Sequence, residues 1–236
     1  MSPVLLDVTD PDSIAKAVDL VARETGGGLD ALINNAGIAV SGPIEFLPIP
    51  ELRKLLEVNV IGLVAVTQAA LPLIRQSQGR VINMGSISGR IASPFIGGYA
   101  ASKHALEGLS DALRVETAPW GVEVVLLEPG AIKTPIWDKG QEEFNLLEQR
   151  LGPVGQSLYG SAVRAFAKMV EVMIRRAESP EEVARVVEEA LLAARPKTRY
   201  VIGRDASYRL IVKKLFSDRI FDRLMLAAIR RFSRER

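Results

Sequence analysis

Tyr99, Lys103 and Ser86 are residues of this chain whose types and spacing could carry out chemistry. Tyr99 and Lys103 are four positions apart, so a helix from Tyr99 through Arg114 would place them on the same face. A fixed ammonium group beside a phenol favours the phenolate and lowers the pKa of the tyrosine from its usual value of about 10. The spacing therefore predicts that Tyr99 is a general acid or base whose pKa is lowered by Lys103.

Ser86 follows the apolar run Gly79–Gly85, which has the length of a strand and ends in glycine. The carboxyl ends of the strands are the edge at which open α/β sheets bind ligands. We therefore predict that Ser86 holds a substrate oxygen while Tyr99 exchanges a proton with that oxygen. A Tyr-x-x-x-Lys pair alone is also common on exposed helix faces, so this interpretation depends on the surrounding motifs.

Strand-like apolar runs alternate with helix-like segments along the chain. Strands are expected at residues 3–7, 29–33, 79–85, 121–130 and 198–203. Helices are expected at residues 10–24, 51–74, 99–114, 161–177 and 179–194. This alternation predicts an α/β fold with a Rossmann-like, doubly wound parallel sheet.

With 236 residues and an apolar content of 48%, the chain can bury the core of one domain. We assign that domain to residues 1–208, with a substrate loop at about residues 135–160 where no clean period is seen. Residues 209–236 form a separate basic, amphipathic extension.

Several short motifs occur in a fixed order along the chain: Asn34-Asn35-Ala36-Gly37, Asn59, Ser86, Tyr99-x-x-x-Lys103 and Pro129-Gly130. This set resembles the short-chain dehydrogenase/reductase family, with specific motifs from Leu6 to Thr134 and a looser likeness to Gly203. The segments 128–135 and 199–205 look most like its retinol, hydroxysteroid and 3-hydroxybutyrate dehydrogenase branch. The resemblance implies an oxidoreductase that uses NAD or NADP.

The resemblance also implies roles for individual residues. The catalytic residues would be Asn59, Ser86, Tyr99 and Lys103, with Asn59 helping to hold a water linked to the lysine. The cofactor would contact Asp7, Val8, Asn35, Ala36, Gly37, Tyr99, Lys103, Pro129, Gly130, Ile132 and Thr134. The substrate would contact Ser86, Ser88, Tyr99 and Trp137. Three of these residues have plain structural alternatives, since Asp7 could cap or stabilise a turn, Thr134 could lie in a turn, and Trp137 could be buried for packing.

One part of the family pattern has no counterpart in this sequence. The family begins with a strand, a Thr-Gly-x-x-x-Gly-x-Gly turn, a helix and a second strand, and no such glycine-rich turn occurs in the 236 residues. We therefore expect an N-terminally incomplete fold without the first two βα units, whether the chain is part of a longer enzyme, a shortened version or a natural remnant. Its strand at residues 3–7 would pair with the strand at 29–33, pair with another chain, or leave a sheet edge exposed. The missing turn puts NAD(P) binding by this chain in question.

Two functions of different classes follow. The first is an NAD(P)-dependent oxidoreductase that interconverts an apolar secondary alcohol and a ketone, with a carbonyl or 3-oxoacyl reductase as the competing member of the same family. The second is a catalytically silent protein whose helices around Asn59 and Tyr99 pair subunits. The resemblance implies a homodimer or homotetramer in either case.

Composition excludes some classes of site. The chain has no cysteine and a single histidine, His104, so we expect no metal site. No apolar run reaches the length of a membrane span, and no basic region precedes an apolar core at the N-terminus, so we expect a cytoplasmic protein.

The formal net charge of +2 hides an uneven distribution. Residues 209–236 contain nine Lys/Arg and three Asp/Glu, which gives +6 there and −4 for residues 1–208. The body therefore shows no signal for nucleic-acid binding. The extension could be a helix packed over the substrate pocket or against a second subunit, or it could contact an anionic membrane surface.

Overall fold

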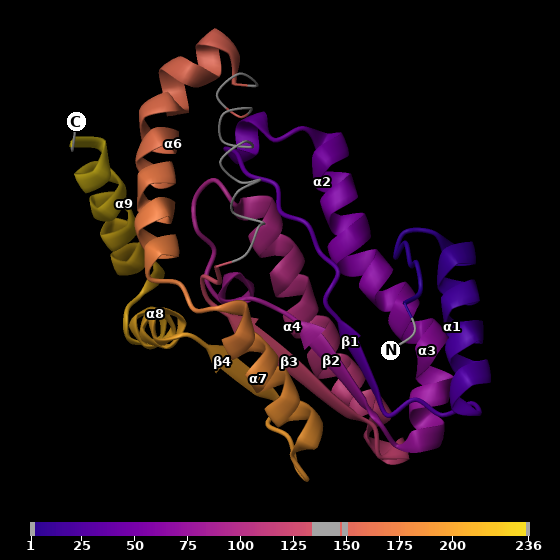
Figure 1. Cartoon of the computed structure of the whole chain (residues 1–236). Helices are drawn as coiled ribbons and strands as arrows, with labels where there is room; N and C mark the ends of the chain where they lie inside the picture. Colours follow the sequence, from indigo (N-terminus) through magenta and orange to yellow (C-terminus); the bar gives the residue numbers. More distant parts are fainter. Residues whose placement is uncertain (1–2, 134–146, 148–150, 235–236) are drawn as a thin grey trace.

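Four parallel strands form the sheet of this protein in a computed structural model that describes residues 3–133, 147 and 151–234 (Figure 1). The strands are β1 (Ala31–Asn34), β2 (Arg80–Met84), β3 (Glu123–Pro129) and β4 (Arg199–Ile202), and they lie side by side in that order. All three pairings are parallel, with Ile33 beside Ile82 and Ile82 beside Val125. The expected Rossmann-like parallel sheet is confirmed.

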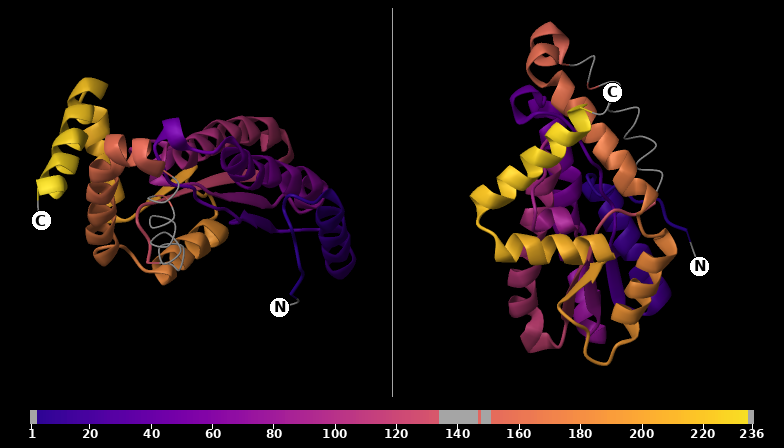
Figure 2. Two further views of the ribbon diagram at one scale, coloured as in Figure 1. Left: turned by 90° about the horizontal axis from the view of Figure 1, so that it is seen from above. Right: turned by 90° about the vertical axis from the view of Figure 1, so that its left-hand side faces the viewer.

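Helices cover both faces of the sheet (Figures 1 and 2). Successive side chains of each strand point to opposite faces, so both faces carry apolar side chains that a helix can bury. Val81 and Val124 pack with α3, whereas Ile82 and Val125 pack with α7. The first layer contains α1 (Pro11–Thr25), the continuous helix α2 (Ile49–Leu56), η2 (Glu57–Gly62) and α3 (Leu63–Ser77), and α4 (Gly97–Thr117). The second face is covered by α7 (Pro180–Leu192).

Three further helices complete the described chain: α6 (Gly152–Arg175), α8 (Arg204–Leu215) and α9 (Asp218–Arg234). Short 3-10 turns occur at η1 (Ile44–Phe46), η3 (Ile87–Gly89) and η4 (Ala118–Trp120). The basic extension therefore forms two helices with a break at Ser217, as its pattern indicated, and α9 packs along α6 (Figures 1 and 2). Contact of this extension with a membrane or a second subunit stays a prediction.

The expected strand at residues 3–7 does not form. The Asp10 N–H donates to the Asp7 carbonyl, and the Asp7 N–H donates to Ser13 Oγ, so this segment is held by the start of α1. Val8 lies against Gly62 of η2, where a Cβ on the glycine would come within 2.7 Å of the Val8 carbonyl oxygen. These contacts replace the ladder of hydrogen bonds that a strand requires.

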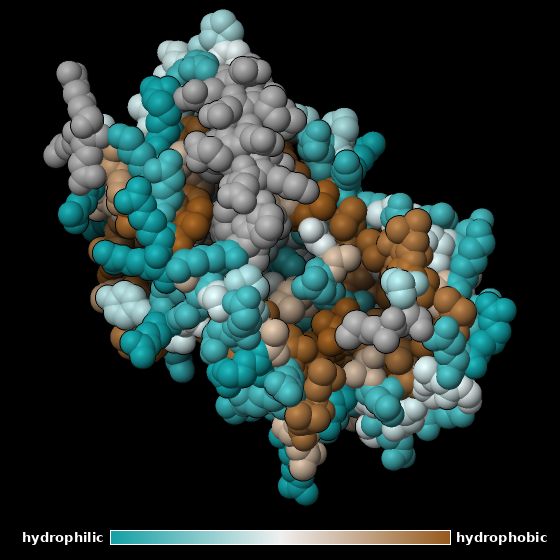
Figure 3. Space-filling model, viewed as in Figure 1, coloured by the Kyte–Doolittle hydropathy of each residue, from teal (hydrophilic) through white to brown (hydrophobic). Residues whose placement is uncertain are grey.

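The edge at β1 is therefore open on one side within the described residues. Ile33 shares the face of Ile82 but stays 41% exposed, and Leu5 is 96% exposed. Figure 3 shows apolar side chains gathered on this face of the molecule. Pairing of residues 3–7 with β1, one of the three arrangements expected here, is therefore wrong; the edge is exposed in the described chain, and its pairing with another chain stays a prediction.

Two other expectations change. Residues 152–159, expected in a loop, belong to α6, and the rest of the expected loop falls on residues 134–146 and 148–150, outside the described part, apart from Leu147 and Leu151. The continuous helix Ile49–Ser77 is long and apolar enough to span a membrane, contrary to the expectation that no segment is. The same composition arises in a core helix, and Leu55 and Ile74 of this helix are fully buried within the protein.

Candidate active site

Helix α4 carries both Tyr99 and Lys103, one turn apart, as their spacing predicts. Lys103 is only 6% exposed, and its Nζ donates to the carbonyl oxygen of Met84 at 2.7 Å. The same Nζ lies 5.7 Å from the centre of the Tyr99 ring. The ammonium group is thus held between the carboxyl end of β2 and the face of Tyr99.

Ser86 comes directly after β2 and caps η3, where its Oγ accepts from the Ser88 N–H at 3.1 Å. Gly85 makes this turn possible because a Cβ there would lie 2.7 Å from the Leu127 carbonyl oxygen. The Ser86 hydroxyl lies close enough to the Tyr99 hydroxyl to lower the pKa of Tyr99 by hydrogen bonding. The structure therefore brings Ser86, Tyr99 and Lys103 together at the carboxyl edge of the sheet, and Ser88 is buried beside them.

The pKa of Tyr99 moves in the opposite direction to the one expected. Burial raises it above 10.0, and the hydrogen bond from Ser86 offsets only part of that effect. Lys103 makes no contribution to this shift, and its ammonium is directed to the Met84 carbonyl. The prediction that Lys103 lowers the pKa of Tyr99 is therefore wrong for this structure.

Burial lowers the pKa of Lys103 from 10.5 to about 8. The unfolded chain then binds more protons than the folded one between these two values, so the free energy of unfolding should rise with pH there. We expect the Lys103→Met variant to lack this rise, which amounts to up to about 3 kcal/mol across the window. Chemical unfolding of both proteins at a series of pH values measures the difference.

The control for this prediction is Lys16→Met, which removes an exposed lysine from α1. That variant should follow the pH dependence of the unaltered chain. Parallel curves for the unaltered chain and Lys103→Met would mean that the buried amine keeps an ordinary pKa.

Asn59 lies in η2, a π-helical turn within the long helix, and is 1% exposed. Its Oδ1 accepts from the Ile38 N–H at 2.8 Å, and its Nδ2 donates to the Ile38 carbonyl at 2.9 Å and to Ser102 Oγ at 3.0 Å. Ser102 Oγ in turn donates to the Tyr99 carbonyl oxygen at 2.8 Å. The amide thus ties the segment after β1 to the start of α4, which is a positioning role, whereas the expected water contact stays a prediction.

A second amide network was missed by the sequence analysis. Asn34 Nδ2 donates to Asn83 Oδ1 and to Thr67 Oγ1, both at 2.9 Å, and Asn83 Nδ2 donates to Ser110 Oγ at 2.9 Å. These buried groups join β1, β2, α3 and α4 beneath the site. The sequence feature that could have revealed this network is Asn83, a polar residue inside an apolar strand.

The residues expected to contact a cofactor separate into two groups. Asn35, Ala36 and Gly37 follow β1 and are exposed, and Pro129 and Gly130 end β3, so both segments lie at the same edge as Ser86. Ile132 pairs with Glu178 just beyond that edge. Asp7 and Val8 precede α1, where the Asp7 carboxylate accepts from the Thr9 N–H at 2.9 Å and its hydroxyl at 2.7 Å. Asp7 therefore makes the turn contacts of its structural alternative, and its contact with a cofactor stays a prediction. Thr134 and Trp137 lie outside the described residues.

The donor set fits the nicotinamide end of NAD(P). Two hydroxyl groups and an amine, from Ser86, Tyr99 and Lys103, suit proton exchange with a substrate oxygen. A pyrophosphate needs backbone N–H groups at a helix N-terminus that follows a strand. Within the described residues α1 instead begins after Asp10, whose carboxylate accepts from the Asp12 N–H and would repel a phosphate.

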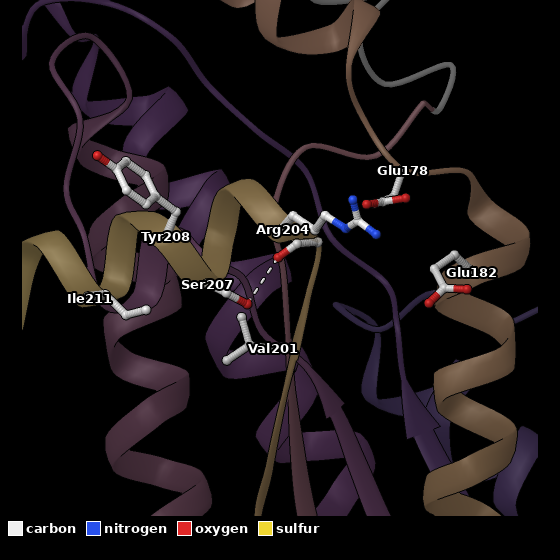
Figure 4. A pocket seen from close by; sticks show the side chains of 8 residues that line it. Glu178, Glu182, Val201, Arg204, Ser207, Tyr208 and Ile211 are labelled. Atoms are coloured by element: carbon white, nitrogen blue, oxygen red, sulfur yellow. Dashed lines mark hydrogen bonds between the residues drawn. The ribbon is translucent and has the colours of Figure 1, made fainter.

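A surface pocket of about 600 Å³ lies between α7, β4 and α8 (Figure 4). Its lining includes Glu178, Glu182, Arg204 and Tyr208, and Ser207 there donates to the Gly203 carbonyl at 3.2 Å. None of the predicted site residues lines this pocket. It is therefore separate from the Tyr99 site.

Sequence comparisons place this site among known enzymes. A family described as short chain dehydrogenase matches residues 1–144. The chain is 37% identical over 238 residues to the NADPH-dependent 3-dehydrocapnine reductase of Ornithobacterium rhinotracheale. This match covers 98% of this chain and 82% of that protein. It is 41% identical over 211 residues to human retinol dehydrogenase 5, covering 86% of this chain but only 65% of that protein's length.

Solved structures agree with these comparisons. A short-chain dehydrogenase from Streptomyces avermitilis matches with a TM-score of 0.70 and 31% identity, over 94% of this chain and 76% of that one. A short chain dehydrogenase from Burkholderia cenocepacia J2315, solved in complex with NADP, matches with a TM-score of 0.64 and 25% identity, over 92% of this chain and 74% of that one.

Proposed function

Since this chain belongs to the short-chain dehydrogenase family of oxidoreductases, in its retinol dehydrogenase-like branch, we propose that it interconverts an apolar secondary alcohol and the corresponding ketone with NAD or NADP. The observation that carries this proposal is that Ser86 and the buried Lys103 amine both lie next to Tyr99 at the carboxyl end of β2. The name of the reductase relative and the bound NADP of a structural neighbour support the choice of cofactor.

The chain's own residues would manage the proton and the substrate oxygen. Bound NAD(P) would supply hydride exchange at the substrate carbon. Ser86 would hydrogen bond to the substrate oxygen, and the Tyr99 hydroxyl would give it a proton or accept one from it. The raised pKa of Tyr99 keeps the phenol protonated near neutral pH, which suits donation to a carbonyl oxygen and therefore reduction of the ketone.

Pro129 and Gly130 would border the nicotinamide, together with the Asn35–Gly37 segment after β1. Gly130 is fixed there because its N–H donates to the Ile202 carbonyl at 2.8 Å. Asn59 would position the site indirectly, because its hydrogen bonds keep the segment after β1 against the start of α4. Assembly as a homodimer or homotetramer in the cytoplasm is part of the same proposal.

Calorimetric titration of the 236-residue chain with NADPH and NADH tests the proposal. We expect saturable heat of binding with a dissociation constant in the micromolar range for at least one of the two. Heat is a better readout than the fluorescence of Trp120, since η4 precedes β3 and so lies at the opposite end of the sheet from Ser86.

Absence of binding up to millimolar NADPH and NADH would contradict the proposal for this chain. That result would favour the alternative of a catalytically silent protein. The sequence feature that supports this alternative is the missing glycine-rich turn. AMP, titrated in the same way, is the control that separates recognition of the nicotinamide end from binding of the adenine end alone.

A further inference from the structure

A fully buried glutamate and a partly buried one, both outside the proposed chemistry, lie next to each other behind the active site. Glu128 is at the carboxyl end of β3, directly before Pro129, and its side chain is fully buried. Glu107 is on α4, one turn beyond Lys103, and its side chain is 13% exposed. Both carboxyl groups lie within 3.5 Å of the same Arg199 nitrogen.

Each carboxyl group has one oxygen bound to arginine. Arg199 Nε donates to Glu107 Oε2 at 3.0 Å and lies 3.5 Å from Glu128 Oε1. Arg90 Nη1 donates to Glu128 Oε1 at 3.1 Å. The other end of Arg199 is occupied, since its Nη2 donates to Asp111 Oδ2 at 2.7 Å.

The second oxygen of each carboxyl group, Glu107 Oε1 and Glu128 Oε2, is buried and has no donor among the described residues. Two carboxylates can only accept hydrogen bonds, so they cannot satisfy each other while both are ionised. Leaving a buried acceptor unsatisfied is costly, and two like charges in contact add to that cost. A single proton removes both problems, because a protonated carboxyl donates to a carboxylate in a strong, charge-assisted hydrogen bond.

The turn η3 packs directly against Glu107. A Cβ at Gly89 would lie 3.0 Å from Glu107 Oε1 and 2.9 Å from the Lys103 carbonyl oxygen. The charged groups that face the pair are Arg90 after η3, Arg199 from β4 and Asp111 from α4, with Arg114 bound to Asp111. The Lys103 ammonium is turned to the Met84 carbonyl.

We propose that Glu107 and Glu128 share one proton at neutral pH, and that this hydrogen bond, which we call the clamp, holds the end of β3 to α4. The folded chain takes up this proton from water as it folds, and no other group changes its charge. The clamp positions Pro129 relative to Lys103 and does not itself touch a substrate. The inference of the clamp does not rest on the proposed oxidoreductase activity.

The clamp makes stability depend on pH with a defined sign. Burial and the charge of Glu128 raise the pKa of Glu107 above 4.5. Stability from this proton is complete below the unfolded value and is lost as pH rises through the folded value. The effect of Lys103 has the opposite slope and begins only at about pH 8, so the two can be measured in separate windows.

Glu107→Gln tests the clamp while preserving its geometry. The amide oxygen of the substituted side chain can accept from Arg199, and the amide NH2 can donate to Glu128 without a shared proton. Between the ordinary value of 4.5 and pH 8, where the effect of Lys103 begins, the unfolding constant of the unaltered chain relative to that of Glu107→Gln should rise with pH, by at most about tenfold per pH unit. Glu116→Gln, an exposed carboxylate on the same helix, should run parallel to the unaltered chain.

Infrared spectroscopy of the unaltered chain in D2O gives a second measurement that does not depend on a variant folding. We expect the carbonyl band of a protonated carboxyl group at neutral pH, absent from Glu107→Gln and from Glu128→Gln. Both carboxyl groups ionised at neutral pH, or pH curves for Glu107→Gln and the unaltered chain that run parallel, would overturn the proposal.

Discussion

Replacing Tyr99 by phenylalanine should reduce turnover of a secondary alcohol or ketone by about 10²–10⁴-fold, the usual contribution of a positioned general acid or base. The variant removes only the hydroxyl that lies next to Ser86, and the ring stays beside the Lys103 amine. The affinity for NAD(P) should therefore stay nearly unchanged. Steady-state rates at cofactor concentrations that saturate the calorimetric binding curve measure the effect.

Tyr208→Phe is the matched control for this experiment. Tyr208 is an exposed residue of α8 that lines the pocket apart from the active site, so its variant should keep the rate of the unaltered chain. Turnover retained in Tyr99→Phe would remove the tyrosine from the proposed mechanism. Loss of both turnover and cofactor affinity would also contradict a role in proton exchange alone, because it would make Tyr99 a binding residue.

Replacing Asn59 by alanine should lower the free energy of unfolding by about 3–5 kcal/mol. The change leaves the Ile38 N–H and carbonyl and the Ser102 hydroxyl without their buried partner, and each unsatisfied group costs about 1–3 kcal/mol. The connection from the segment after β1 to the start of α4 is lost with them. Chemical unfolding followed by circular dichroism measures the change.

Two further variants show whether the hydrogen bonds of Asn59 cause this effect. Asn59→Asp keeps an acceptor for the Ile38 N–H but has no amide donor, so it should be destabilised as well. Asn35→Ala removes an exposed amide two residues before Gly37 and should change stability by less than about 0.5 kcal/mol. Equal stability of Asn59→Ala and Asn35→Ala would mean that the π-helical turn holds without the amide.

Local patterns were enough to predict most of the secondary structure. The alternation of apolar runs and helix-like segments predicted all four observed strands and the helices α1, α3, α4 and α7 to within a few residues. The prediction of a strand at the N-terminus was wrong because a strand needs a neighbouring strand to pair with as well as a strand-like pattern. Residues 3–7 have that pattern, but their backbone groups are held by the start of α1 and by η2, and no neighbouring strand pairs with them in the described chain.

In the candidate site too, local sequence patterns predicted some features, and other features depend on the fold. The spacing of Tyr99 and Lys103 determined that they share a helix face, and the position of Ser86 after an apolar run determined that it lies at the carboxyl edge of the sheet. The order of these motifs along the chain was also sufficient to identify the family. These features depend on neighbours within one or two helical turns or at the end of one strand, and local periodicity controls both.

Only the tertiary structure decided the electrostatics and the buried polar contacts. The pKa of Tyr99 depends on how much water the folded chain removes, and burial raises it where the spacing alone suggested a lower value. The partners of Asn34, Asn59 and Glu107 are separated from them in the sequence and come from other strands, from another helix and from the segment after β1. Desolvation and long-range hydrogen bonds are properties of the packed chain, and so no pattern read along the sequence could specify them.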